Sequence, residues 1–125
     1  MNTGIVVLGH GSRASVGEAN QVVFQVTEQV KAKAGHDLVE TAIMNRMSKL
    51  QCLEEAVEKL IARGAMTVTV VPMFFANGMH IQSDIPGEIA EIQAKHPGVV
   101  IKMANHIGPD SRIADILLER VQEVG

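Results

Sequence analysis

The sequence is poor in several residue types on which whole classes of protein depend. It has no tryptophan and no tyrosine, and only three phenylalanines. Its single cysteine, Cys52, excludes an internal disulfide and points to a reducing compartment. A formal net charge of −3 at pH 7 gives no electrostatic reason to expect a nucleic-acid partner. No apolar run approaches the ~20 residues that cross a membrane, and no signal-peptide pattern opens the chain. We therefore expect a cytoplasmic protein that binds no membrane.

Several catalytic motifs are also missing. Neither Gly-x-x-x-x-Gly-Lys nor Gly-x-Gly-x-x-Gly occurs, which argues against a nucleotide-binding loop. A His-Gly pair after a strand occurs in serine hydrolases, but no Gly-x-Ser-x-Gly elbow follows it here. Neither Cys-x-x-Cys nor His-Glu-x-x-His is present, so the chain lacks the ligand patterns of a permanent metal centre.

Hydrophobic patterning predicts an alternation of strands and helices. Strands are expected at residues 5–8, 38–44, 67–73 and 99–104, and helices at 15–34, 52–63, 83–95 and 110–124. This order predicts a single three-layer α/β domain over residues 1–125. Its four-stranded parallel sheet is expected in the order 2-1-3-4, because strands one and three are the most apolar.

The ends of the last two helices carry specific expectations. Ser83 or Asp84 is expected to cap the third helix, with Pro86 in its first turn. Asp110 is expected to cap the last helix. In that helix a helically spaced apolar stripe is expected to be buried, formed by Ile113, Ile116, Leu117 and Val121.

Two histidines are expected to meet at the carboxyl edge of the sheet. His10 follows the first strand, and His80 lies in the loop expected at residues 74–82 after the third strand. The predicted switch point falls between these two strands, where open α/β sheets bind ligands. Neutral imidazole binds cobalt, nickel, iron and zinc. Either histidine alone suits a structural role, whereas the pair indicates a metal that is held briefly and passed on. His106, past the fourth strand, is interpreted as structural.

Other side chains near this edge suit a large anionic ligand. Some are apolar and either close the core or form a floor for a flat molecule: Met44, Met47, Phe74, Phe75 and Met79. Others are basic and able to bind carboxylates, Arg in bidentate fashion: Arg13, Arg46, Lys49 and Arg112.

Five segments of the sequence resemble those of a known family. They are Gly9-His10-Gly11-Ser12-Arg13, Glu18-Ala19-Asn20, Val71-Pro72-Met73-Phe74-Phe75, Gly78-Met79-His80 and Asp84-Ile85-Pro86. The chain is similar over nearly its whole length to the short-form sirohydrochlorin cobaltochelatases, which are class II tetrapyrrole chelatases related to the sirohydrochlorin ferrochelatases. The resemblance implies a chelatase-like fold. It also implies ATP-independent insertion of a divalent metal into sirohydrochlorin, in cobalamin or other tetrapyrrole biosynthesis.

The resemblance also implies a site. His10 and His80 would bind the metal and catalyse its insertion. Co²⁺ is the expected substrate, with Ni²⁺ or Fe²⁺ as alternatives, and no cofactor is permanently bound. Short members pair as homodimers. The implied substrate-binding residues are Gly9, Gly11, Ser12, Arg13, Arg46, Phe75, Asn77, Gly78 and Met79.

One departure leaves alternatives open. Asn45 stands where many relatives have a glutamate, which leaves the choice of metal open. A non-catalytic carrier of metal or tetrapyrrole is the alternative from another functional class, and a hydrolase that uses His10 is a third.

Overall fold

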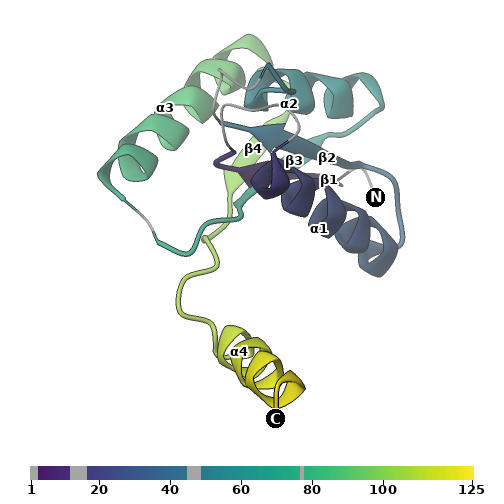
Figure 1. Cartoon of the computed structure of the whole chain (residues 1–125). Helices are drawn as coiled ribbons and strands as arrows, with labels where there is room; N and C mark the ends of the chain where they lie inside the picture. The colour runs from purple at the N-terminus through teal and green to yellow at the C-terminus, as the bar shows by residue number, and fades with distance from the viewer. Residues whose placement is uncertain (1–2, 12–16, 45–48, 77) are drawn as a thin grey trace.

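The structure is a computed structural model. It describes residues 3–11, 17–44, 49–76 and 78–125, and for residues 79–82 it describes the backbone alone. The elements are β1 (Thr3–Gly9), α1 (Glu18–Ala34), β2 (Val39–Ile43), α2 (Leu53–Ala62), β3 (Thr67–Pro72), α3 (Met79–Lys95), β4 (Val100–Met103) and α4 (Ser111–Glu123) (Figure 1). The predicted alternation of strands and helices is confirmed.

The sheet has the predicted topology. Its four strands are all parallel and lie in the order β2-β1-β3-β4. β1 is central, with Ile5 opposite Val39 of β2 and Val6 opposite Val70 of β3. The chain moves from β1 to one edge of the sheet and then returns to build the other. The switch point therefore falls between β1 and β3, as expected.

Helices cover the sheet unequally. On one face α2 and α3 bury the larger core, which contains Val6, Leu8, Leu53, Val57, Leu60, Val68, Val70, Ile85, Ile89, Ile92 and Ile101. On the other face α1 packs on β1 and β2 through a smaller cluster of Val7, Val23, Val39 and Ile43. Figure 1 shows α2 and α3 on one side of the sheet and α1 on the other.

The start of α3 corrects a prediction. The helix begins at Met79 after Gly78, not at Ser83 or Asp84, and Pro86 lies inside it. A proline inside a helix lacks an N–H donor and costs about 3 kcal/mol. Burial offsets this cost, because Ile85 and Ile92 are almost completely buried against the sheet. His80 therefore belongs to the first turn of a helix, where a loop was expected.

The position of α4 corrects another prediction. Asp110 caps this helix as expected, since its side chain accepts a hydrogen bond from the Arg112 backbone N–H at 2.9 Å. None of its residues is buried, however, and Figure 1 shows it standing apart from the sheet. The stripe expected to be buried is open, with Leu117 and Val121 62% and 63% exposed. The apolar pattern correctly predicted an amphipathic helix, but such a pattern does not say on which surface the helix packs.

Candidate functional site

His10 lies at the carboxyl end of the central strand, between two chain segments that continue from its neighbours. The backbone N–H of Met44, just after β2, donates to the Gly9 carbonyl at 2.9 Å. The N–H of Met73, just after β3, donates to the Leu8 carbonyl at 2.8 Å. These bonds hold the three strand ends together up to the residue before His10. The His10 side chain is exposed beyond them, at the switch point.

Two glycines fix the turn that carries His10. A Cβ on Gly9 would lie 2.6 Å from Cγ2 of Val23, so α1 can approach the strand end only because no side chain is there. Gly11 has a φ of 78° and therefore takes a left-handed conformation that other residues rarely adopt. A Cβ on Gly11 would lie 2.2 Å from Cγ2 of Ile43. Both positions require glycine for reasons of packing.

The His10 ring rests against the edge of the core. Its centroid lies 5.9 Å from that of the Phe74 ring, and the two planes meet at 71°, an edge-to-face arrangement. Phe74 is 6% exposed, so it is a fixed support. The Nδ1 atom of His10 lies 3.5 Å from the Gly11 carbonyl oxygen, at the limit for a hydrogen bond. The imidazole is thus positioned by packing more than by strong hydrogen bonding, and it remains accessible to a ligand.

Many of the predicted partners of His10 lie outside the described residues. The backbone of His80 is placed in the first turn of α3, but its side chain is not described, and neither is that of Met79. Ser12, Arg13, Arg46, Met47 and Asn77 also lie outside the description. The convergence of the two imidazoles therefore stays a prediction. It is supported by the placement of Gly78 and α3 directly after the strand next to β1.

The residues that follow β3 differ in their exposure to solvent. Phe74 belongs to the core, whereas its neighbour Phe75 is 71% exposed. Gly78 precedes α3 with a φ of −71°, and a Cβ there would meet nothing within 4 Å. Phe75 can therefore offer an apolar surface to a ligand, and Gly78 leaves open space at the start of α3.

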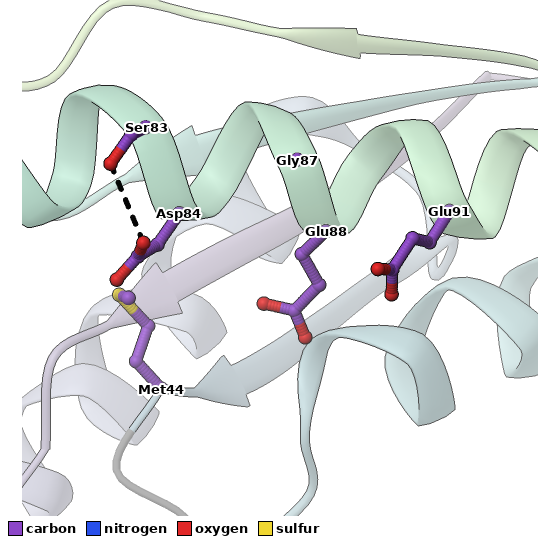
Figure 2. A pocket seen from close by; sticks show the side chains of 6 residues that line it. All are labelled: Met44, Ser83, Asp84, Gly87, Glu88 and Glu91. Atoms are coloured by element: carbon purple, nitrogen blue, oxygen red, sulfur yellow. Dashed lines mark hydrogen bonds between the residues drawn. The ribbon is translucent and has the colours of Figure 1, made fainter.

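An acidic cavity beside this edge was missed at the level of sequence. It has a volume of about 490 Å³ and lies between α3 and Met44 at the end of β2. Figure 2 shows the side chains of Asp84, Glu88 and Glu91 extending from the same side of α3 toward it. Their spacing of four and three residues was a signal for one helix face. Among the described side chains, no set of three is arranged to hold a metal ion.

His106 and Arg112 lie in a different place from His10. They line a separate open cavity of about 320 Å³, together with Val71 and the first turns of α4. The Arg112 guanidinium donates two hydrogen bonds to the Asp110 carboxylate, at 2.8 and 2.7 Å. This contact holds the pKa of Asp110 well below its usual range and raises that of Arg112. Arg112 is therefore already engaged with a carboxylate at the start of α4.

The single cysteine does not resemble an activated nucleophile. Cys52 precedes α2, where its backbone N–H donates to Glu55 at 3.0 Å as part of a capping box. Burial raises the pKa of its thiol, which disfavours the reactive thiolate. Cys52 is thus a helix-capping residue.

The fold and the site place this protein in one class. It is a three-layer α/β domain with a parallel sheet and an accessible histidine, His10, at the switch point of that sheet. A family model described as CbiX matches residues 4–124, and the chain belongs to this family. It is 39% identical to a sirohydrochlorin cobaltochelatase of Sulfurisphaera tokodaii over 123 residues, covering 97% of this chain and 92% of that protein. It is 36% identical to a sirohydrochlorin cobaltochelatase of Sulfolobus acidocaldarius, covering 96% and 90%. These relatives have nearly the same length as this chain.

Solved structures agree with the fold. A putative cobalamin biosynthesis CbiX protein from Marinobacter aquaeolei superposes with a TM-score of 0.76 at 28% identity, covering 97% of this chain and 95% of that one. SirB from Bacillus subtilis with Fe³⁺ superposes with a TM-score of 0.86 at 28% identity, covering all of this chain and 48% of that one. The chain thus spans about half the length of SirB. No helix in the described part of the chain is both long and apolar enough to span a membrane.

Proposed function

We propose that this protein is a sirohydrochlorin cobaltochelatase, which inserts Co²⁺ into the tetrapyrrole without ATP. Two observations together carry the proposal. The exposed imidazole of His10 stands on a glycine-flanked turn at the switch point of the sheet, and the chain belongs to the CbiX family. The near full-length relatives named above are cobaltochelatases, which favours cobalt over Ni²⁺ and Fe²⁺. The product then enters cobalamin or another tetrapyrrole pathway.

The chemistry requires a weak and accessible metal ligand. Sirohydrochlorin loses two pyrrole N–H protons as Co²⁺ becomes bound to the four ring nitrogens. His10 and His80 hold the ion beside the face of the macrocycle until the ring nitrogens replace them. The two released imidazoles are neutral, and each can then accept one of the two protons. Two nitrogen ligands are fewer than a permanent zinc centre uses, so the metal is substrate and no cofactor stays bound.

The surroundings of His10 suit this substrate. The exposed Phe75 side chain offers an apolar contact to a flat macrocycle. Gly9 and Gly11 allow the tight turn that carries His10, and Gly78 adds no side chain to the open space before α3. Asn77, Met79 and Ser12 complete the proposed binding loops. Arg13 and Arg46 pair with the peripheral carboxylates of the ring, which a guanidinium binds in bidentate fashion.

The proposal includes an assembly and a location. The protein acts as a homodimer, because a single domain of this size offers one wall of a cleft for a large ring. The loops at residues 45–51 and 74–79 are the proposed contacts beside the substrate. The lone, partly buried Cys52 fits the reducing environment of the cytoplasm.

The test is cobalt insertion measured by the absorbance change of sirohydrochlorin, with protein in catalytic amount. His10→Ala and His80→Ala should each nearly abolish insertion, while far-UV circular dichroism stays unchanged. His106→Ala is the matched control, because His106 lines a separate cavity, and it should retain most of the activity. A His80→Ala variant that works at the parental rate would refute the two-histidine mechanism.

The same assay tests the alternatives. A carrier would change the absorbance only in stoichiometric amount, with no turnover. Nickel and iron in place of cobalt identify the preferred metal. Hydrolysis of ester substrates without any metal would instead support a hydrolase that uses His10.

A further inference from the structure

Two polar side chains of α1 are buried in the described part of the chain. Asn20 is 0% and Thr27 is 2% exposed. Seven residues separate them, so they lie on the same side of the helix, which faces the sheet. The Thr27 hydroxyl donates to the Val23 carbonyl at 2.7 Å and accepts from the Thr41 hydroxyl at 2.8 Å. Thr27 therefore joins α1 to the middle of β2.

Asn20 has a different neighbour, the turn that carries His10. It belongs to the first turn of α1, and its Oδ1 atom lies 3.0 Å from the position that a Cβ on Gly11 would take. Cγ2 of Ile43 lies 2.2 Å from the same position. The residue just after His10 is thus packed against α1 through Asn20 and against β2 through Ile43.

The burial of an amide at this point requires a reason. A buried amide costs free energy unless it is hydrogen-bonded. Within the described residues no buried side-chain nitrogen or oxygen lacks a hydrogen-bond partner, and Asn20 is among the residues that interact. Apolar side chains such as those of Val23 and Ile43 fill space equally well. Hydrogen bonds are directional, however, so a bonded amide fixes the backbone beside it more narrowly than an apolar side chain would.

The His10 imidazole depends on its backbone for its position. Its Nδ1 atom lies 3.5 Å from the Gly11 carbonyl oxygen, at the limit for a hydrogen bond, and its ring meets the Phe74 ring edge to face. Both contacts are weak and tolerate movement. The position of the ring at the switch point therefore follows that of the backbone at residues 9–11.

We propose that Asn20 is a positioning residue for metal insertion, whose buried amide holds the Gly11 turn and thereby fixes the point from which His10 reaches the metal. Asn20 is completely buried, so it acts through His10 and touches neither metal nor macrocycle. This inference rests on the proposed chelatase function and adds a residue to it. Loss of the amide should displace His10 by roughly 1 Å, a displacement that lowers a catalytic rate about 100-fold.

The kinetic test compares Asn20→Ala with Thr27→Ala in the full-length chain. Each variant removes a buried polar side chain from the same side of α1, so both should lower the midpoint of urea unfolding. Only Asn20→Ala should also lower kcat for cobalt insertion by the folded protein, by about 100-fold, with the KM for sirohydrochlorin unchanged. Asn20→Ser, which keeps a shorter polar group, is measured in the same way and replaces Asn20→Ala if that variant does not fold.

Proton NMR of the histidine rings measures the position of His10 without the reaction. The Phe74 ring lies edge to face with His10 and should shift the ring-proton signals of His10 away from those of a free imidazole. A spectrum of His10→Ala identifies these signals by their absence. In Asn20→Ala they should move toward the values of a free imidazole, and in Thr27→Ala they should stay at the parental values.

Three results would overturn the positioning role. They are an Asn20 variant with parental kcat, His10 signals that stay in place in that variant, and an equal loss of kcat in Thr27→Ala. A parental protein that inserts no cobalt would instead refute the proposed function. The His10 signals would then decide by themselves whether Asn20 holds the turn.

Discussion

Replacement of Gly11 by alanine tests how the turn that carries His10 is held. The added methyl would lie 2.2 Å from Cγ2 of Ile43 and 3.0 Å from Oδ1 of Asn20. Ordinary contacts between carbon atoms are about 3.5–4.0 Å, so the turn or its neighbours must move by roughly 1 Å. Ile43 is 2% exposed and Asn20 is completely buried, so neither has free space into which it can move.

Gly35→Ala is the matched control for this substitution. Gly35 has a φ of 77°, against 78° for Gly11, but a Cβ there would meet nothing within 4 Å. Both variants carry the left-handed cost of about 1–2 kcal/mol for a residue with a side chain. Only Gly11→Ala adds the cost of overpacking, about 1–3 kcal/mol. At this short distance we expect the upper end, a difference of about 3 kcal/mol between the variants.

Urea unfolding at one fixed protein concentration measures the difference. The corresponding gap in melting temperature is about 10 °C, at about 3–4 °C for each kcal/mol in a domain of this size. Cobalt insertion by the folded fraction should also fall about 100-fold in Gly11→Ala, because His10 is displaced by about 1 Å. Equal unfolding midpoints for the two variants would refute the packing argument. A folded Gly11→Ala protein with parental activity would refute the link from this turn to the chemistry.

Three further predictions concern the core, the α4 cap and the substrate edge. Leu60→Ala should lower the free energy of unfolding by about 2–5 kcal/mol, because Leu60 is fully buried. The control, Met66→Ala at an exposed site, should change this free energy by less than about 0.5 kcal/mol in the same urea titration. The pKa of the Asp110 carboxyl should lie below its ordinary value of 3.8, because Arg112 stabilises the charged form. The contact between Asp110 and Arg112 therefore stabilises the fold above pH 3.8, and this stabilisation is lost only at lower pH. Titration followed by carboxyl-carbon NMR should show a higher pKa for Asp110 in Arg112→Gln. Phe75→Glu should weaken both cobalt insertion and the dimer. The free energy of unfolding should change little, since this side chain is 71% exposed. Unchanged insertion kinetics would show that Phe75 is not part of the substrate surface.

Local pattern was sufficient for most of the architecture. The apolar, largely β-branched runs at residues 5–8 and 67–73 identified the two central strands, and the alternation with helices left few parallel topologies to consider. The position of His10 followed directly, because a residue just after a central parallel strand must lie at the carboxyl edge. The Asp110 cap was also readable, since capping depends on a few consecutive residues.

Contacts between distant residues decided the rest. α3 begins at Met79 because Ile85 and Ile92 pack on the sheet firmly enough to hold a proline inside the helix, and no local signal reveals that burial. The need for glycine at position 11 comes from Ile43, which is remote in sequence and close only after β1 and β2 have paired. The stripe of α4 is visible in the sequence, but the surface that it covers is not. Helical periodicity indicates which side of a helix avoids water, but it does not identify the surface on which that side packs, and none of the residues of α4 is buried in this structure.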